Sequence, residues 1–322
     1  MSGRILSPDS LIKRALILSG FLLTALLLSS CRGEPLQKDG EKPLVVASLF
    51  PQYDFVRQIA GGEVDVELLL PPGSESHTFD PGPKDIERVY GADLFVYTGD
   101  YMEPWAGRIV SGAEGRVRIV NASSGIELAE AGHEDETGHD GHDHDGHAYD
   151  PHVWLDPTLA MVMVDNIADG LCEIIPDRAE LFKNNAEEYK KKLNRLDEDT
   201  FETVKNGRRD TLCFAGRFAY YYFLRRYDLK YETAYESCST EAEPSLRAIT
   251  RICEFIKYNG IPCVYHEELA DPKIAKAVAA ETGASCELFS TGHSVSKDEF
   301  DSGVTFLDVM NGNLERIRKG LG

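Results

Sequence analysis

Residues 178–207 read RAELFKNNAEEYKKKLNRLDEDTFETVKNG, and their pattern decides how the chain is divided. Apolar residues recur at spacings of four and three, with charged residues between them: Phe182, Ala186, Tyr189, Leu193 and Leu196. This period is typical of one amphipathic helix that buries a single face, and Asn206-Gly207 is a typical stop signal. At 1.5 Å per residue the helix would span roughly 40 Å, longer than one small lobe needs. We therefore interpret residues 178–207 as a linking helix between two lobes.

Strand-like and helix-like runs alternate on both sides of this helix. Before it, the sequence predicts strands at 44–49, 64–70, 94–97 and 117–120, and helices at 51–60, 83–90 and 103–111. After it, the predicted strands are 211–214, 229–234, 262–265 and 286–289, and the predicted helices 218–226, 244–258, 272–282 and 305–320. Such alternation favours parallel sheets covered by helices. The predicted fold class is α/β, with two doubly wound lobes, a long rigid helix joining them, and a ligand cleft between the lobes where the strands end.

The first 31 residues are typical of a targeting segment. Basic residues precede an apolar run at 15–28, which is shorter than the about 20 residues of a membrane-spanning helix and suits a secretory signal. The run ends in Leu28-Ser-Ser-Cys31, which resembles a bacterial lipobox and implies lipid on Cys31; the alternative is an ordinary signal peptide with a chance cysteine. The predicted division is a signal peptide 1–31, a tether 32–42, an N-terminal lobe 43–177, the linking helix 178–207 and a C-terminal lobe 208–322.

Charge and cysteine content narrow the class of protein. The net charge is −20 at pH 7, which suits neither nucleic acid nor a bare anionic lipid surface as a partner. The chain has seven cysteines but no CxxC pair, so a zinc ribbon is poorly supported. An exported location permits disulfides, but the sequence does not pair these cysteines.

Six of the nine histidines fall in one stretch, residues 133–152, which reads HEDETGHDGHDHDGHAYDPH. The first five alternate with carboxylates and glycines: His133, His139, His142, His144 and His147. Glycine and aspartate favour disorder, and imidazoles at this density suit a divalent metal. We interpret 131–150 as an accessory metal loop, the alternative being a solvated acidic loop without a metal.

Three further histidines lie on loops between predicted elements. His77 follows the strand 64–70, His152 precedes a helix that begins near Pro157, and His293 follows the last strand. Three imidazoles on loops at strand ends could converge on one ion, and neutral imidazole suits Zn²⁺ at about 2.0–2.1 Å with four ligands. His266 continues a strand, so a structural role is predicted for it.

Several motifs along the chain carry a family resemblance. They are residues 47–51 (ASLFP), 70–81 around His77, 97–105 (YTGDYMEPW), the acidic histidine run before 152–157 (HVWLDP), 241–245 (EAEPS), 281–284 (ETGA) and 305–314 (TFLDVMNGNL). These motifs cover nearly the whole chain after the tether, in order. The chain thereby resembles the metal-binding lipoproteins of zinc and manganese ABC importers, the adhesin-like solute-binding family.

This resemblance implies two α/β lobes, a rigid helix between them and one transported metal in the cleft. It also implies an extracytoplasmic protein, lipid-anchored to the bacterial cell membrane, that delivers metal to an integral-membrane permease driven by a cytoplasmic ATPase. His77 and His152 match the two ligands that the family supplies from its N-terminal lobe. A binding protein of this kind is not an enzyme.

The second lobe departs from the family pattern. The family typically has a histidine or glutamate where this chain has Arg217, and arginine offers no lone pair to a metal. The family's last ligand is usually an aspartate in the loop where this chain has His293, so we predict that His293 replaces it. Arg217 is expected to pair with Glu243 or Glu267. The fourth ligand is left open among water, Glu241, Glu243 and Glu267.

The metal and the function each have an alternative. Three histidines and a histidine-rich loop favour Zn²⁺, whereas a manganese-specific protein would be expected to offer more carboxylates. A zinc-dependent hydrolase would need an open coordination position and a base, but the chain has neither an HExxH helix nor a GxSxG elbow. A surface adhesin is a further alternative, but no segment reads as an exposed apolar patch or repeat; a zinc buffer that has no transporter is also compatible with the sequence.

Overall fold

The computed structural model describes residues 42–113, 115–130, 149–235, 244–269 and 271–322. Of these, Lys42–Gly322 belong to one compact unit. The predicted signal peptide with Cys31, nearly all of the tether, and the five accessory histidines lie outside the described residues. So do Glu241 and Glu243. The predictions for these segments, and the exact domain boundaries, stay predictions.

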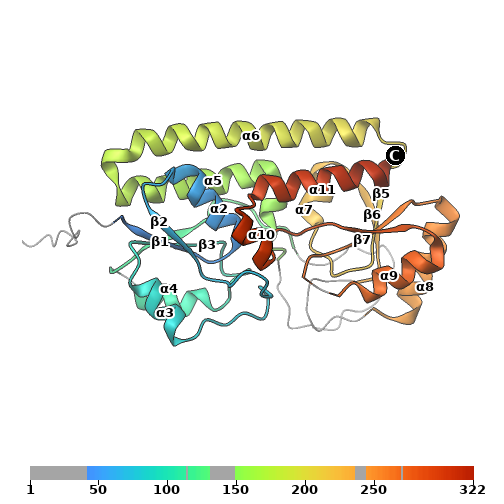
Figure 1. Ribbon diagram of the computed structural model, residues 1–322, viewed down its shortest axis with the longest axis horizontal. Coiled ribbons are helices and arrows are strands. Elements are labelled where there is room, and N and C mark those ends of the chain that lie inside the picture. Colours follow the sequence, from blue (N-terminus) through green and yellow to red (C-terminus); the bar gives the residue numbers. More distant parts are fainter. Residues whose placement is uncertain (1–41, 114, 131–148, 236–243, 270) are drawn as a thin grey trace, which may run out of the picture. The chain divides into compact units, whose positions relative to one another are not determined.

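The N-terminal lobe is built on a parallel sheet with the strand order β2-β1-β3-β4 (Figure 1). Its two central strands are the most buried, as expected for strands covered by helices on both faces. The strands are β1 (Leu44–Ala47), β2 (Asp65–Leu68), β3 (Leu94–Tyr97) and β4 (Arg118–Asn121). The helices are α2 (Phe50–Ala60), α3 (Pro83–Tyr90), α4 (Ala106–Ala113) and, after the short η1 (Val153–Leu155), α5 (Pro157–Ile174).

The C-terminal lobe repeats the same strand order in its own sheet, β6-β5-β7-β8, again parallel. The predicted fold class, two parallel-sheet α/β lobes, is therefore confirmed. The strands are β5 (Thr211–Phe214), β6 (Lys230–Thr233), β7 (Cys263–His266) and β8 (Ser285–Leu288). The helices are α7 (Tyr221–Arg226), α8 (Leu246–Asn259), α9 (Lys273–Thr282), α10 (Lys297–Ser302) and α11 (Phe306–Leu321).

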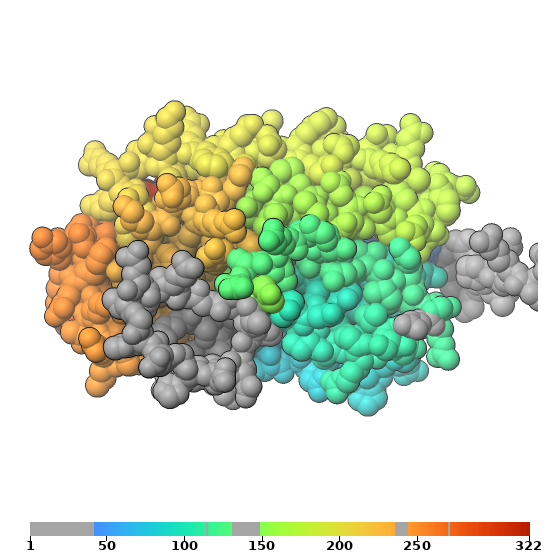
Figure 2. Space-filling view, turned by 180° about the vertical axis from the view of Figure 1, so that it is seen from behind, coloured from blue at the N-terminus to red at the C-terminus, as the bar shows by residue number. Residues whose placement is uncertain are grey.

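A long helix, α6 (Ala179–Asn206), follows the short η2 (Pro176–Arg178) and runs along both lobes (Figures 1 and 2). Its 28 residues correspond to about 42 Å. The apolar stripe read from the sequence is its buried face, with Phe182 and Leu193 fully inaccessible to solvent. That face packs on α2, α5 and α11. Helix α11 also contacts β5, β7 and β8, so two helices rather than one run between the lobes.

The hydrophobic core explains why the lobes hold together. One continuous cluster of buried side chains includes residues of both lobes, among them Val45, Tyr189, Phe214 and Leu314. Two smaller clusters each cover the outer face of one sheet. A shared apolar layer of this kind resists hinge bending, because opening it would expose close-packed side chains to water.

Three local differences from the sequence predictions have physical reasons. Helix α4 begins at Ala106 rather than at residue 103, because the Glu103 carboxylate instead accepts hydrogen bonds from Ser48 and from the Thr98 and Gly99 amides. Helix α8 begins at Leu246, since the Ser245 hydroxyl caps it by accepting the Ala248 N–H at 3.1 Å. Helix α10 was not predicted. It is a short helix that begins with a capping box, in which the Ser296 hydroxyl accepts the Glu299 N–H.

Within the described part of the chain, no helix combines the length and the apolar character needed to cross a bilayer. The described cysteines are all free thiols: Cys172, Cys213, Cys253, Cys263 and Cys286. Burial raises the pKa of the Cys213 thiol to about 12, so this thiol behaves as a core residue rather than as a reactive one.

Candidate metal centre

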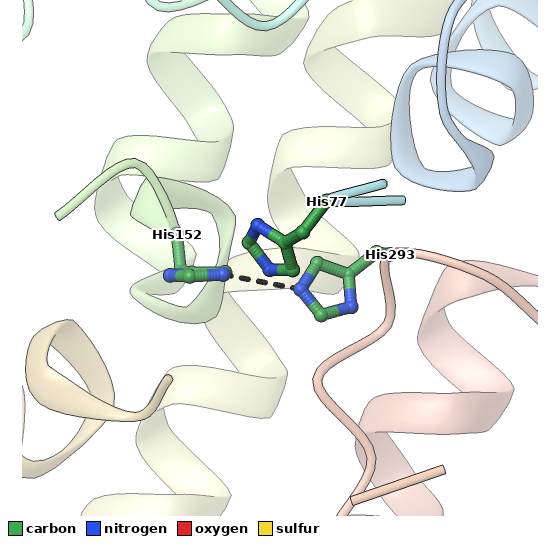
Figure 3. Close-up of side chains that lie close together, drawn as sticks. All are labelled: His77, His152 and His293. Atoms are coloured by element: carbon green, nitrogen blue, oxygen red, sulfur yellow. Dashed lines mark hydrogen bonds between the residues drawn. The ribbon is translucent and has the colours of Figure 1, made fainter. Parts of the chain in front are cut away.

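Three histidines from distant parts of the sequence meet between the lobes (Figure 3). His77 lies on the loop after β2, His152 immediately precedes η1, and His293 lies on the loop after β8. One ring nitrogen from each lies within 4.8 Å of the other two. The ring centroids are 5.0, 5.1 and 5.4 Å apart, so the imidazoles form a nearly equilateral triangle. The three imidazoles are therefore candidate ligands of one ion.

A carboxylate fixes the orientation of His152. The Nδ1 atom of His152 lies 2.8 Å from the Asp150 Oδ1 atom, which also accepts the His152 backbone N–H at 2.9 Å. The imidazole is 1% exposed. A carboxylate on Nδ1 holds the proton on that atom and leaves the Nε2 lone pair for the cleft.

His293 is oriented in the same way from the C-terminal lobe. Its Nδ1 atom lies 3.4 Å from the Glu268 carboxylate and forms a short contact with the Thr291 hydroxyl. Glu268 in turn accepts the Thr291 amide N–H at 2.7 Å. Although burial by itself raises the pKa of Glu268, the hydrogen bond and charge of His293 and the Thr291 donors bring it below its usual value. Gly292 reaches this geometry in the left-handed region, at φ 72°.

The two oriented imidazoles point their Nε2 atoms at each other. The His152 Nε2 and His293 Nε2 atoms are 3.1 Å apart. Two ligands of a tetrahedral zinc ion at 2.0–2.1 Å would have nitrogen atoms about 3.3 Å apart. The two nitrogen atoms are at hydrogen-bond distance, so either one proton or one metal cation can lie between them. The pair is therefore set up to share a positive ion.

Trp154 forms an apolar wall behind this pair. Its ring lies 5.5 Å from the His152 ring and 5.8 Å from the His293 ring, and it is 1% exposed. The indole N–H donates to the Thr291 carbonyl at 2.8 Å, which joins η1 of the first lobe to the last loop of the second. The wall keeps water away from one side of the site and holds the two histidine loops in register.

Arg217 lies at the same site but is bonded to carboxylates. Its Nε atom donates to Glu267 at 3.0 Å, and its NH1 atom forms an ion pair with Glu75 at 2.9 Å. Glu267 is one of the two partners expected from the sequence, whereas Glu75 was not foreseen. The other Glu267 oxygen accepts the Arg217 backbone N–H at 3.0 Å. Gly216 makes this approach possible, because a Cβ atom there would stand 1.9 Å from that oxygen.

A small cavity of about 20 Å³ adjoins the histidines, with room for one water-sized ligand. His77, His293, Arg217, Glu75, Glu267 and Glu268 are among its lining residues. Among the described residues, no carboxylate joins the three imidazoles in a common cluster. His266 does not join it either; its Nδ1 atom lies 2.8 Å from the Glu267 carbonyl oxygen. Sequence reasoning missed Glu75, Asp150 and Glu268, which support the site rather than form its centre.

Comparison with known proteins agrees with this architecture. The family described as "zinc-uptake complex component A periplasmic" matches residues 45–320. The chain belongs to this family. It is a family of solute-binding transport proteins, and its members share the two-lobe fold.

Relatives in the zinc-uptake family cover most of the chain. The high-affinity zinc uptake system protein ZnuA of Bacillus subtilis (strain 168) is 35% identical over 303 residues, 94% of each protein. The zinc-binding lipoprotein AdcA of Streptococcus pneumoniae (serotype 4) is 32% identical over 299 residues, which are 92% of this chain but only 59% of AdcA. The crystal structure of the Zn(II)-bound ZnuA-like domain of S. pneumoniae AdcA is similar with a TM-score of 0.73 and 28% identity, over 87% of this chain and 99% of that domain.

Proposed function

We propose that this chain is an extracytoplasmic binding protein that captures Zn²⁺ between its lobes and delivers it to an ABC importer. The observation that carries the proposal is the pair of Nε2 atoms of His152 and His293, 3.1 Å apart, with His77 completing the triangle. Each of the two paired imidazoles has a carboxylate at its Nδ1 atom. A carboxylate behind each metal-binding imidazole is characteristic of zinc sites.

The ligand set favours zinc over manganese. Neutral imidazole suits Zn²⁺, whereas Mn²⁺ is held better by carboxylate and water oxygens. Glu267 has both oxygens engaged by Arg217, which leaves water as the best-supported fourth ligand in the adjoining cavity. The named relatives, a zinc uptake protein and a zinc-binding lipoprotein, point to the same ion.

The same geometry supports transport rather than catalysis. The cavity beside the histidines holds about one water molecule, so a substrate ester or phosphate has no place next to the ion. We infer that the partners are an integral-membrane permease and its cytoplasmic ATPase, and that lipid on Cys31 anchors the chain to the bacterial cell membrane.

The histidine-rich loop is proposed as an accessory metal loop, since its two ends are fixed beside the site. Glu130 and Tyr149 form an isolated antiparallel bridge. The Tyr222 hydroxyl accepts the Ala129 N–H at 2.9 Å and donates to the Asp150 carbonyl at 2.8 Å. Asp150 also orients His152, so the loop ends a few residues before a proposed ligand, and its start is paired with that end.

Zinc titration with chelator competition tests the proposed site. The background is the chain with its five loop histidines changed to alanine, which isolates the central site. His77→Ala, His152→Ala and His293→Ala should each weaken zinc binding by about 100-fold or more, because each removes one of the few strong bonds to the ion. His266→Ala is the matched control and should leave zinc affinity unchanged. Tight zinc binding that survives any two of the three substitutions would refute the assignment.

Delivery is tested separately in cells. A strain that lacks this chain should grow poorly when zinc is chelated, and the intact gene or added zinc should restore growth. The His152→Ala gene should fail to restore it. Poor growth that added manganese corrects, but zinc does not, would overturn the choice of metal.

A further inference from the structure

An ion-paired triad joins the two lobes inside the metal cavity. Arg217 of the C-terminal lobe contacts Glu267 of its own lobe and Glu75 of the N-terminal lobe. The side chains of Arg217, Glu75 and Glu267 are 18%, 32% and 11% exposed, so the triad is largely shielded from solvent. All three residues line the same cavity as His77 and His293.

Arg217 engages carboxylate oxygen atoms of residues that line the same cavity as His77 and His293. Arg217 takes one Glu75 oxygen through NH1 and both Glu267 oxygens through its Nε and backbone N–H groups. Glu75 is also bound to the His77 loop, since its other oxygen accepts the His77 backbone N–H at 3.3 Å. Without the positive charge of Arg217, two carboxylates would remain beside the three imidazoles. Their uncompensated negative charge would favour a bound cation.

We propose that Arg217 is a specificity-determining residue that withholds Glu75 and Glu267 from the metal. With these carboxylates engaged, the site offers three nitrogen ligands and one small solvent ligand. This set suits zinc, which accepts four ligands, and disfavours Mn²⁺, which needs more oxygen ligands. The inference rests on the proposed zinc site and adds how that site excludes a competing ion.

The backbone next to Arg217 favours its contact with Glu267. Gly216 lets the Glu267 carboxylate lie against the backbone before Arg217, where any larger residue would displace it. The fork of Arg217 spans both lobes, which the single ammonium of a lysine cannot do as well. The resulting lattice of charge-assisted hydrogen bonds holds both carboxylates in one orientation.

The test compares Zn²⁺ and Mn²⁺ affinities of the full chain with alanine at the five loop histidines. Arg217→Gln should tighten Mn²⁺ binding by about tenfold or more, because two oxygen ligands are released, while zinc affinity should rise by a smaller factor, since four-coordinate Zn²⁺ gains little from added oxygen ligands. Arg217→Lys, which can retain one carboxylate, should give a smaller gain for Mn²⁺. X-ray absorption at the manganese edge should show added oxygen ligands in Arg217→Gln.

The matched control adds Glu75→Gln and Glu267→Gln to Arg217→Gln, and it should return Mn²⁺ affinity to the parent value. If Arg217 only held the two lobes together, these two further substitutions would not restore the parent Mn²⁺ affinity. An unchanged ratio of the two affinities in Arg217→Gln, or an equal loss of both, overturns the proposal. If Arg217→Gln does not fold, the Arg217→Lys variant decides, and the absence of any Mn²⁺ gain refutes it. A parent chain that binds no zinc through its three histidines would instead refute the proposed function.

Discussion

Two largely buried glutamates follow corresponding strands of the two lobes, but only one of them contacts a proposed metal ligand. Strands β3 and β7 occupy the same place in the two sheets. After β3, Glu103 is 1% exposed and accepts hydrogen bonds from Ser48, Thr98 and Gly99, all in its own lobe. After β7, Glu268 accepts hydrogen bonds from Thr291 and faces the imidazole of His293.

The two environments shift the carboxyl pKa values in opposite directions. Burial raises the pKa of Glu103 to about 7, and its neutral donors only partly offset that effect. Burial also acts against the charged form of Glu268, but the imidazole of His293 and the Thr291 donors lower its pKa overall. Loops that follow corresponding strands therefore supply a structural anchor in one lobe and a group that orients a proposed ligand in the other.

Substitution of Glu103 should have the largest effect, and the effect should be on stability. At pH 5, Glu103→Ala should lower the free energy of unfolding by about 4 kcal/mol, because two amides and two hydroxyls lose their partner inside the protein. Urea unfolding of the metal-free chain measures this change. Zinc affinity of the folded fraction should remain within about threefold of the parent value. A large loss of zinc affinity with unchanged stability would reverse the roles assigned to the two glutamates.

The pH dependence of stability should reflect the raised pKa of Glu103. Between its ordinary pKa of 4.5 and about 7, folded Glu103 holds a proton that the unfolded chain has released. Stability should therefore fall as pH rises through this window, by up to about 3 kcal/mol, and its contribution should be constant above it. Glu103→Gln keeps the shape and presents its amide N–H₂ to the Ser48 and Thr98 hydroxyls. In this variant, the decrease in the free energy of unfolding between pH 4.5 and about 7 should be smaller. An unchanged decrease would show that another group causes it.

Glu268→Gln should affect the metal and not the fold. Zinc binding should weaken by about 10- to 100-fold, since the imidazole of His293 loses the negative charge that fixes its tautomer. Thermal unfolding of the metal-free chain should change little, because the Gln oxygen still accepts the Thr291 amide. Isothermal titration with zinc measures the effect. Equal zinc affinity in the two chains would show that Glu268 only supports the loop.

Asp150→Asn should have the smallest effect of the series. Asp150 plays toward His152 the part that Glu268 plays toward His293, but its Oδ1 atom also accepts the His152 backbone N–H. An Asn oxygen can keep both contacts, so zinc affinity should weaken by only about tenfold. The double variant with Glu268→Gln should show roughly additive losses in binding free energy, as expected for independent orienting groups on separate ligands. A markedly smaller combined loss would indicate that one carboxylate already controls both rings.

Much of the fold was predictable because it follows from periodicity. The four-and-three spacing from Phe182 to Leu196 predicted a helix over 178–205, and α6 covers Ala179–Asn206. Alternating apolar runs placed each strand within a few residues. The three central histidines were predicted from their loops, because parallel strands bring their carboxyl ends to one edge. That they bind a metal remains the proposal tested above.

The supporting residues were not predictable, since their roles depend on contacts across long sequence separations. Glu268 and His293 are 25 positions apart and on different loops, and nothing in either loop alone indicates the contact. Glu75 meets Arg217 only because the lobes face each other. Glu103 belongs to the motif 97–105, but nothing in that motif indicates that its carboxylate turns inward and delays the start of α4.

The loop that carries His293 is attached to the opposite lobe. The Phe50 amide donates to the His293 carbonyl at 3.2 Å, and the Gly73 amide donates to the Val295 carbonyl at 2.8 Å. The loop with His293 thus follows a strand of the C-terminal sheet but is hydrogen-bonded to the backbone of the N-terminal lobe. That lobe also carries His77 and His152. From the C-terminal side, Glu268 and Thr291 contact the His293 ring. His293 is therefore bonded to both lobes at once, so a tilt of one lobe against the other would have to break either these side-chain contacts or the two backbone hydrogen bonds. Opening of the proposed site is thus expected to begin with detachment of this one loop from one of the lobes.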